Sequence, residues 1–597
     1  MKFYKDILVG SAIALSLAGC SKVMDKTNLS ALDGAIVYND STLAFLNLSY
    51  IYDNNLPGWF GSTGGAISGN GSFSEESFGE SKFFEGTVDQ NTVGDIGTNN
   101  NKNNVWGKIR KINEFVRDMN AGPLPQYTKD KMTAEAVFFR AFRYFDLVRL
   151  YGGVPLVLTP LDPVGDQAKE EIMLPRNSTS ECITQIVKDL DFAIAHLPLK
   201  WASKDDWGRI TSGAAAAFKG RVLLTYASPQ FNPNDLQERW QAAYDANLQA
   251  KNLLTAGGFG LNSSYDGMWF SEANNPEAVL VTGYNTVTTD QFKKNNSYDN
   301  QTRPSYFGTS GGSNQPSWDL VKEYRMKDGK KPGQSAYAYD EVLFYKNRDP
   351  RFDMTIAYNG STWKLLGEDQ RIWTYFVDGK TVETKASNTG FYLKKAVSPT
   401  INVDDLAQNK SGTDWMEIRY AEVLLNLAEA ACGINRLSQS EEAYNGIIAV
   451  RRRAGIDPGS NMLYGLPASI SRDDMFTEIL DERQIEFAFE GKRFWDLRRW
   501  KLFESELNGK RRTGLRHTLK TGAGIPTAAQ LQENRNNIPL DEIYTDYFTT
   551  EVYDKDTKYA INWKPEYYFF GLPTSTINND PALEQTNLWG GNFDPLK

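Results

Sequence analysis

Histidine and cysteine are scarce in this chain of 597 residues, which contains two histidines, His196 and His517, and three cysteines. Zinc sites in proteins draw on several histidine or cysteine ligands held close together. The composition therefore excludes a histidine-rich zinc site, a four-cysteine zinc site and any mechanism that needs several histidines. We place His196 at a helix end and His517 in a loop, and we expect no metal and no cofactor.

An excess of positive charge is also lacking. The chain has 65 lysines and arginines against 74 acidic residues, which gives a formal net charge of −9, and the basic residues are not clustered. Proteins bind nucleic acid largely by neutralising its phosphates with basic side chains. We therefore expect no nucleic-acid partner.

Long apolar runs are lacking except at the N-terminus. There Lys2 and Lys5 precede an apolar run over residues 7–18, which leads into Gly19 and Cys20. The run has the length of the apolar part of a signal peptide and is shorter than the about 20 residues of a membrane-spanning helix. It resembles the lipobox of bacterial lipoproteins, which implies a signal peptide over 1–19 and stable membrane anchoring by acyl chains on Cys20. The alternative is a buried helix with an incidental cysteine.

The other two cysteines, Cys182 and Cys432, lie on segments that are predicted to be helical. A disulfide between them is possible in an exported protein. We favour two buried free thiols, because an unpaired cysteine usually behaves as a small apolar residue.

Aromatic residues, by contrast, are abundant: they make up 13% of the chain, with 14 tryptophans and 29 tyrosines. Some of them fall in residues 54–104, where glycine, asparagine and serine supply 25 of 51 positions. Disordered segments usually lack aromatic residues, and long loops in compact proteins are often functional. We therefore expect 54–104 to be an ordered loop.

Five segments carry apolar side chains at the three- and four-residue spacing of a helix. They are 131–151, 212–227, 415–431, 441–453 and 473–500. Small residues alternate with large aromatic ones along them, and Gly213 and Gly220 would let another helix approach closely. This pattern is typical of stacked helix pairs, as in tetratricopeptide-type solenoids, although no strict repeat is visible.

The segments outside the helical groups are irregular. Residues 257–400 are rich in glycine, asparagine, serine, tyrosine and tryptophan, with short strand-prone runs at Ala278–Thr282 and Met354–Tyr358. We expect an insertion of loops and short strands on a helical frame. The C-terminal part, 505–597, is again predicted to be rich in loops.

Several stretches together resemble the SusD/RagB family of outer-membrane lipoproteins of Bacteroidetes. The matching stretches are FFRAFRYFDLVRLYGGVPL (138–156), RITSGAAAA (209–217), EIRYAEVLLNLAEA (417–430), VRRRAGI (450–456) and DERQIEFAFEGKRFWDLRRW (481–500). Their order and spacing span nearly the whole chain, including the lipobox.

The resemblance implies a mainly α fold: a tetratricopeptide-like scaffold of helix pairs with a large irregular region of loops and short strands that binds the ligand. After the signal peptide, it implies a helical region over 20–256, the irregular insertion over 257–400, helical repeats over 401–504 and a loop-rich end.

In function, the resemblance implies a glycan-binding lipoprotein of the cell surface that captures oligosaccharides and passes them to a TonB-dependent, SusC-like porin. Such proteins are not enzymes. Surface-exported members of this group often carry an acidic run after the lipidated cysteine, whereas Ser21–Lys26 contains one acid and two lysines. Exposure on the outer leaflet is therefore a separate question from lipidation.

The charged stretch 481–500 could suggest an active site, because it contains several carboxylates. Its arginines and acids also fall at spacings that allow pairing along a helix, such as Arg483 with Glu486, or Asp496 with Arg493 and Arg499. We interpret these residues as ion pairs that hold the helices together, and we predict no catalytic residues.

A sugar ring binds with its C–H face on an aromatic ring and its hydroxyls on polar side chains. We looked for such rings in irregular, polar surroundings, because the ligand residues of the family follow no fixed motif. The first cluster is Trp59 and Phe60, with Phe83 and Phe84 beyond them. The second cluster lies within 284–307 and comprises Tyr284, Phe292, Tyr298, Arg303 and Tyr306.

For each of these residues the alternative is loop packing or contact with the porin. By contrast, we expect a core position for the tryptophans on or beside predicted helices, which are Trp106, Trp207, Trp415, Trp495 and Trp500. Two other functions stay open. A surface glycoside hydrolase would need two carboxylates about 5–10 Å apart across a cleft, and a helical scaffold of the same family could bind peptides or proteins only.

Overall fold

The structure is a computed structural model. It describes residues 37–67, 71–97, 104–161, 172–286, 295–307, 312–408 and 410–597. The predicted signal peptide, its Cys20 and the candidate residue Phe292 lie outside the described residues. Within the described ranges, no helix combines the length and apolarity needed to cross a membrane.

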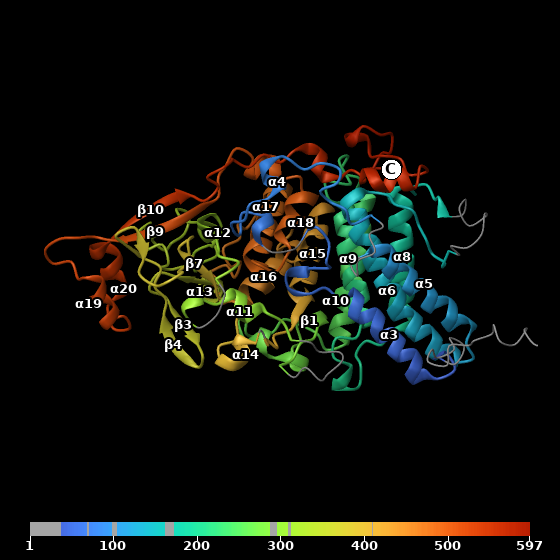
Figure 1. Cartoon of the computed structure of the whole chain (residues 1–597), viewed down its shortest axis with the longest axis horizontal. Helices are drawn as coiled ribbons and strands as arrows, with labels where there is room; N and C mark the ends of the chain where they lie inside the picture. Colours follow the sequence, from blue (N-terminus) through green and yellow to red (C-terminus); the bar gives the residue numbers. More distant parts are fainter. Residues whose placement is uncertain are drawn as a thin grey trace, which may run out of the picture.

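Six long helices form one half of the molecule, on the right of Figure 1. They are α3 (Ser41–Asn55), α5 (Val105–Ala121), α6 (Gln126–Tyr151), α8 (Thr179–His196), α9 (Ser212–Ala227) and α10 (Gln237–Ala256). Helices that follow one another in the chain pack together: α5 on α6, α6 on α8, α8 on α9 and α9 on α10. This confirms the stacked-helix scaffold expected from the apolar spacing.

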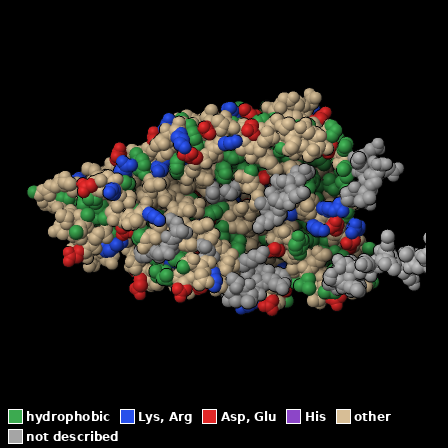
Figure 2. Space-filling model, in the orientation of Figure 1, with side chains coloured by type: hydrophobic (Ala, Val, Ile, Leu, Met, Phe, Trp, Pro, Cys, Tyr) green, Lys and Arg blue, Asp and Glu red, His purple; other side chains and the backbone are tan. Residues whose placement is uncertain are grey.

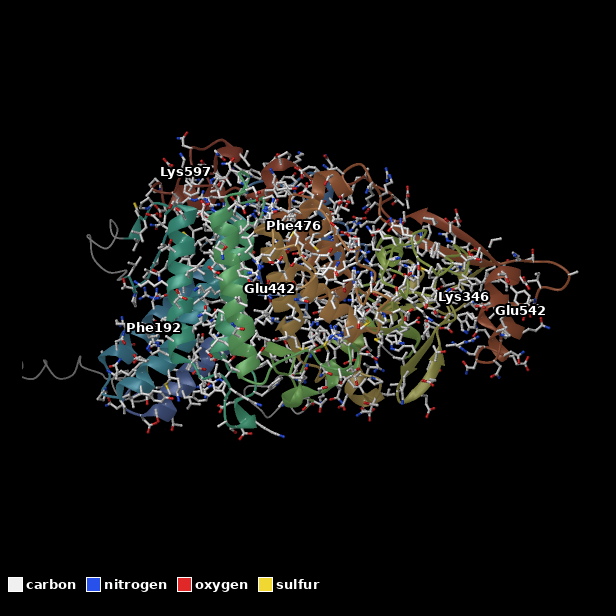
Figure 3. The ribbon with its side chains drawn as sticks, turned by 180° about the vertical axis from the view of Figure 1, so that it is seen from behind. Phe192, Lys346, Glu442, Phe476, Glu542 and Lys597 are labelled. Atoms are coloured by element: carbon white, nitrogen blue, oxygen red, sulfur yellow. The ribbon has the colours of Figure 1, made fainter. Side chains whose placement is uncertain are left out.

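The scaffold continues in the middle of the molecule with helices from the C-terminal part of the chain. These are α15 (Tyr420–Gly433), α16 (Glu442–Ala454), α17 (Arg472–Glu486) and α18 (Arg493–Arg499). Helix α15 packs on α10, and α16 and α17 pack on α15. Figure 3 shows the order from behind, with Phe192 in the first helical group and Glu442 and Phe476 in the second.

Small residues set the distance between α9 and α10. A Cβ atom added at Gly220 would lie 2.2 Å from Oδ1 of Asn247, and one added at Gly213 would lie 2.6 Å from Cδ2 of Leu254. Real Cβ atoms do not approach so closely, so a larger residue at either position would force the facing side chain to shift. The prediction that these glycines allow close helix approach is confirmed.

Two predicted helices differ from the structure. Residues 415–431 begin as strand β8 (Trp415–Arg419), because this fully buried segment pairs with β1 (Ala278–Thr282) before α15 starts. Residues 473–500 form two helices instead of one. Between them Phe489 and Gly491 have left-handed backbone, and the Phe489 N–H donates 2.9 Å to Oε1 of Glu76 from the N-terminal loop.

Short helices and small sheets make up the other half of the molecule. The short helices there are α11 (Tyr298–Thr302), α12 (Trp318–Glu323), α13 (Pro350–Thr355), α14 (Val403–Ala407), α19 (Ala528–Glu533) and α20 (Leu540–Glu542). Two further short helices, α4 (Lys82–Glu85) and α21 (Thr574–Asn579), pack instead against the core of the long helices. The remaining strands are β2 (Ile356–Tyr358), β3 (Thr362–Leu365), β4 (Glu368–Arg371), β5 (Phe376–Val377), β6 (Lys380–Thr381), β7 (Phe391–Leu393), β9 (Thr513–Leu519) and β10 (Phe548–Asp554). The predicted strand over Ala278–Thr282 is confirmed as β1.

The strands form several small, separate sheets. There are two-stranded sheets β1–β8, β2–β7 and β3–β4, and a four-stranded sheet in the order β10–β9–β5–β6. The last sheet forms the arm at the left of Figure 1, near Lys346 and Glu542 in Figure 3. The segment 505–597, predicted to be rich in loops, contributes strands β9 and β10 to this sheet. His517 lies buried on β9 and not in a loop, and burial lowers the pKa of its imidazole to about 3.

A network of buried ion pairs joins α13 and β8 to α17 and the residues that follow it. Arg351 contacts Glu482 at 2.6 Å and Glu486 at 2.8 Å, and Arg419 contacts Glu490 at 2.6 Å. The structural interpretation of this charged stretch is thus supported, but most partners are distant in sequence. Arg483, for instance, pairs with Asp496 and Asn426 and not with Glu486.

Cys182 and Cys432 are both free and fully buried. Burial raises the pKa of the Cys182 thiol to about 11. The prediction of two buried free thiols is confirmed.

Candidate ligand-binding site

A tight turn presents the first predicted aromatic pair. The Gly58 N–H donates 2.8 Å to the Ser62 carbonyl, and the Gly61 N–H donates 3.0 Å to the Gly58 carbonyl. Phe60 has φ 61° and ψ 22°, a left-handed conformation that is uncommon for a residue with a side chain. Residues held in this way often cluster at ligand sites, so the turn is a candidate for function.

Trp59 lies in a cluster of aromatic rings from distant parts of the chain. Its indole stacks on Tyr298 with the ring centroids 3.6 Å apart and an interplanar angle of 6°. Trp269 is stacked at 6.0 Å and Trp415 lies tilted at 5.3 Å. The structure therefore brings together the two clusters that the sequence analysis treated separately, through Trp59 and Tyr298.

Two indole N–H groups in this cluster, those of Trp59 and Trp269, are buried and have no hydrogen-bond partner in the described part of the chain. An unpaired buried donor costs about 1–3 kcal/mol. Such groups call for an explanation, and a ligand that accepts hydrogen bonds is one.

Asp414 connects this cluster to the neighbouring loop. Its Oδ1 accepts the N–H of Tyr284 at 2.7 Å, and its Oδ2 accepts the indole N–H of Trp207 at 2.8 Å. Thr282 donates 2.6 Å to the carbonyl of Pro57, which precedes the turn. The aromatic turn, the end of β1 and the loop around Trp207 are thus fixed to one another.

The structure places the remaining candidates differently from the prediction. Phe83 and Phe84 are 5% and 0% exposed, and Phe83 packs edge-on against Phe494 and Phe570. The prediction that these two rings offer a face to a ligand is wrong, because the ordered loop turns them into the main core.

Tyr298 and Arg303 are also buried, so neither is a platform on the surface. Tyr298 donates 2.6 Å to the carbonyl of Lys395, which holds its ring under Trp59. Arg303 contacts Asp299 and Ser398, and burial lowers its pKa. Tyr306 is half-buried beside Tyr392, with ring centroids 6.5 Å apart. Trp59, Phe60 and Tyr284 are half-buried and line the candidate site.

The sequence analysis did not find Trp269 and assigned Trp415 to the core only. Trp415 is fully buried as predicted, but it also supports the aromatic turn. The local sequence marked this site through the glycine-flanked Trp59 and the polar surroundings of Tyr284 and Tyr298. It did not mark Trp269, because the neighbours of Trp59 are determined by tertiary contacts.

Buried carboxylates on α15 and in the charged stretch 481–500 are held as anions by neighbouring cations. Burial opposes ionisation of Glu422, but Arg221 and Lys492 outweigh it and lower its pKa to about 2. Burial is likewise outweighed at Glu486 by Arg453, Arg419 and Arg351, which hold its pKa well below the usual range. A general acid needs a pKa near the working pH, so these anions are structural.

Comparison with known proteins identifies the family of this chain. A family model described as "SusD family" matches residues 276–589, which is more than half of the chain. The chain belongs to the SusD family. A second model, described as "Starch-binding associating with outer membrane", matches residues 62–224. The resemblance seen in the sequence motifs is confirmed.

Two curated relatives of the SusD family are similar over much of the chain. A SusD-like protein of Bacteroides ovatus is 23% identical over 481 residues, which are 79% of this chain and 77% of that protein. The SusD-like protein P2 of Formosa agariphila is 26% identical over 377 residues, 62% of this chain, and the match spans 65% of that relative's length.

Solved structures of the SusD family have the same fold. A SusD-like protein of Bacteroides fragilis gives a TM-score of 0.69 at 22% identity and covers 93% of this chain and 98% of its own. A SusD-like carbohydrate-binding protein of the same species gives 0.68 at 23% identity, covering 92% and 99%. A laminarin-binding SusD-like protein gives 0.56 at 20% identity, covering 91% and 98%. These likenesses confirm the mainly helical architecture.

Proposed function

We propose that this protein is a non-catalytic, glycan-binding lipoprotein of the outer membrane. It is anchored by acyl chains on Cys20, faces the cell exterior, captures an oligo- or polysaccharide and delivers it to a TonB-dependent, SusC-like porin. Membership of the SusD family is the observation that carries this proposal. The descriptions of the second family model and of two solved structures, as starch-binding, carbohydrate-binding and laminarin-binding, support it.

The half-buried aromatic turn supports a sugar ligand at this site. Trp59 and Phe60 are fixed by the turn and by Tyr298 beneath, so little side-chain entropy is lost when a sugar ring packs on them. Burying about 60 Å² of apolar surface on one ring contributes about 1.5 kcal/mol. Two or three such contacts supply about 3–4.5 kcal/mol, which corresponds to a dissociation constant of about 1 mM. Weak binding of this kind suits a protein that must release its cargo.

The test uses the soluble chain from Ser21 onward in affinity gels that contain starch, laminarin or other plant, fungal and host polysaccharides. We expect retardation by one class of glycan, and loss of retardation in Trp59→Ala. The matched control is Tyr50→Ala, which removes a 54% exposed ring on α3. A glycan that retards Tyr50→Ala and Trp59→Ala equally would place binding elsewhere.

A reducing-sugar assay on the same mixtures separates binding from hydrolysis. The proposal expects no sugar release, whereas turnover would identify a glycoside hydrolase. For the anchor and the porin, full-length protein and Cys20→Ser are compared in membrane fractions of the native host. We expect the wild type in the outer membrane, co-purifying with a porin, and the variant in the soluble fraction.

A further inference from the structure

A second cleft lies next to the aromatic turn. It has a volume of about 430 Å³ and runs between the loop before α9, the end of α10 and strand β1. Its lining includes Trp201, Trp207, Phe259 and Val281. Small-molecule pockets usually measure about 300–1,000 Å³ and combine aromatic walls with a few polar groups, so this cleft has the size and character of a ligand site.

The first wall of the cleft is rigid. The guanidinium of Arg209 lies over the Trp201 ring, 3.5 Å from its centroid, and also pairs with Glu135 at 2.6 Å. The Trp201 indole N–H donates 3.0 Å to the carbonyl of Ile210. Because these contacts already fix both side chains, a ligand can bind this wall without ordering it first.

The opposite wall is the outer edge of a strand. β1 pairs with β8 on one side, and on its other side it has no strand partner within the described ranges. Val279 and Val281 line the cleft there. A Cβ added at Gly208 would lie 3.3 Å from the Val281 carbonyl oxygen, so the loop at Gly208 is in contact with this strand edge. Unpaired strand edges offer backbone donors and acceptors to a ligand.

The rim of the cleft is polar and carries both charges. Exposed Lys200 and Lys204 and half-buried Asp206 lie on it. Asp206 accepts a hydrogen bond from Arg209 at 2.8 Å. Hydroxyl groups can accept from the lysines and donate to the carboxylate, whereas a highly charged ligand of either sign would meet repulsion from one of them.

The cleft and the aromatic turn are adjacent. Trp207 on the cleft and Tyr284 beside the turn share the carboxylate of Asp414. Val281 and Tyr284 are three positions apart on and just after β1, a span of about 10 Å at the rise of a strand. A chain of a few sugar rings is long enough to cover this distance.

We propose that this cleft is a second saccharide-binding site, and that a longer oligosaccharide occupies the cleft and the aromatic turn at once. The proposal rests on the function proposed above and adds the chain-length preference of the site. Joining two weak contacts on one ligand raises its affinity without any new contact, because the second contact forms at a high effective concentration. The protein therefore selects long chains over disaccharides.

The test is calorimetry with disaccharides and longer oligosaccharides prepared from laminarin and from starch. Ala202 is exposed on the rim of the cleft, so Ala202→Arg fills the cleft without disturbing the core. We expect the wild type to bind the longer chain at least about tenfold more tightly than the disaccharide. Ala202→Arg should lose this advantage while its affinity for the disaccharide stays unchanged.

Two controls separate the cleft from indirect effects. Ala242→Arg places the same side chain at an exposed position of α10 outside the cleft and should behave as the wild type. In the wild type, hydrogen exchange over 200–209 and 278–282 should slow with the longer chain and not with the disaccharide.

The outcomes distinguish this inference from the proposed function. If Ala202→Arg keeps the long-chain preference and exchange over 200–209 is unchanged, the second site is refuted, while binding that depends on Trp59 would leave the proposed function intact. If the wild type binds neither these oligosaccharides nor any polysaccharide of the affinity-gel panel, the proposed function itself fails, and this inference with it.

Discussion

The indole of Trp59 lies flat on the phenol ring of Tyr298, with 3.6 Å between the ring centroids and 6° between the planes. The first residue belongs to a turn within the loop 54–104 and the second to a short helix in the irregular half. Tyr298 is buried and hydrogen-bonded to Lys395, so it acts as a fixed base for a half-buried ring. This stack is the structural centre of the candidate site.

Trp59→Ala should weaken glycan binding by about tenfold or more, because one apolar ring contact contributes about 1.5 kcal/mol. Calorimetry with the glycan found by affinity gels measures the change. Trp59→Phe keeps a ring on Tyr298 and should recover part of the affinity. Equal affinities for the wild type and Trp59→Ala would remove Trp59 from the site.

Gly61→Ala should impair the turn in two ways. Gly61 has φ 71°, and a Cβ at this position would lie 3.2 Å from Oε2 of Glu417. Left-handed backbone costs an alanine about 1–2 kcal/mol, and the contact displaces the turn further. The matched control is Gly379→Ala, since Gly379 has φ 78° with open space around it.

Both glycine variants should therefore lose a similar amount of stability through backbone strain, as chemical denaturation would show. Only Gly61→Ala should also lose glycan affinity. A normal affinity in Gly61→Ala would mean that the geometry of the turn does not matter for binding.

Glu76 should make stability depend on pH. Burial raises the pKa of this carboxyl to about 7 from an ordinary 4.5, and neighbouring Glu75 adds to the shift. Between these two values the folded protein binds a proton that the unfolded chain has released. The free energy of unfolding therefore falls as the pH rises through this window, by about 3 kcal/mol in all.

Glu76→Gln keeps the shape and cannot ionise, so its stability should vary less between pH 5 and pH 8. Urea denaturation at both pH values measures the difference. Glu80→Gln is the control, because Glu80 is exposed and paired with Lys558 at 2.7 Å on the surface. An identical pH dependence in the wild type and Glu76→Gln would contradict the assignment.

Arg419→Met should destabilise the fold by about 3–5 kcal/mol, because Glu277, Glu486 and Glu490 would each lose a buried cation. Arg419→Lys keeps one charge without the forked geometry and should lose less. Chemical denaturation gives both values. Arg117→Met, which breaks an ion pair with Asp118 at a 58% exposed arginine, should change stability by less than about 1 kcal/mol.

The sequence predicted the helices well where the apolar spacing was regular. The predicted segment 212–227 coincides with α9, and Ala278–Thr282 coincides with β1. The helix prediction failed at Trp415–Arg419. This apolar run is consistent with a helix, but it pairs as strand β8 with β1. Local spacing cannot distinguish the two when every side chain is buried, since the decision depends on a partner strand more than a hundred residues away.

The candidate site was predicted only in part, for the same reason. Glycines around Trp59 marked an irregular turn, and the structure keeps Trp59 half-buried there. Phe83 and Phe84 lie in an equally irregular sequence but are core residues, since the loop folds back on Phe494 and Trp563. Composition around a ring does not reveal which other segment covers it.

The sequence by itself determined the class of fold, the family and the prediction of a lipid anchor at Cys20, because apolar periodicity and contiguous motifs are local properties of the chain. The tertiary structure alone decided which rings are exposed, which carboxylate each buried arginine binds and that Asp414 joins Trp207 to Tyr284. Burial and long-range pairing arise from contacts between segments that are far apart in the chain, and these contacts exist only once it has folded.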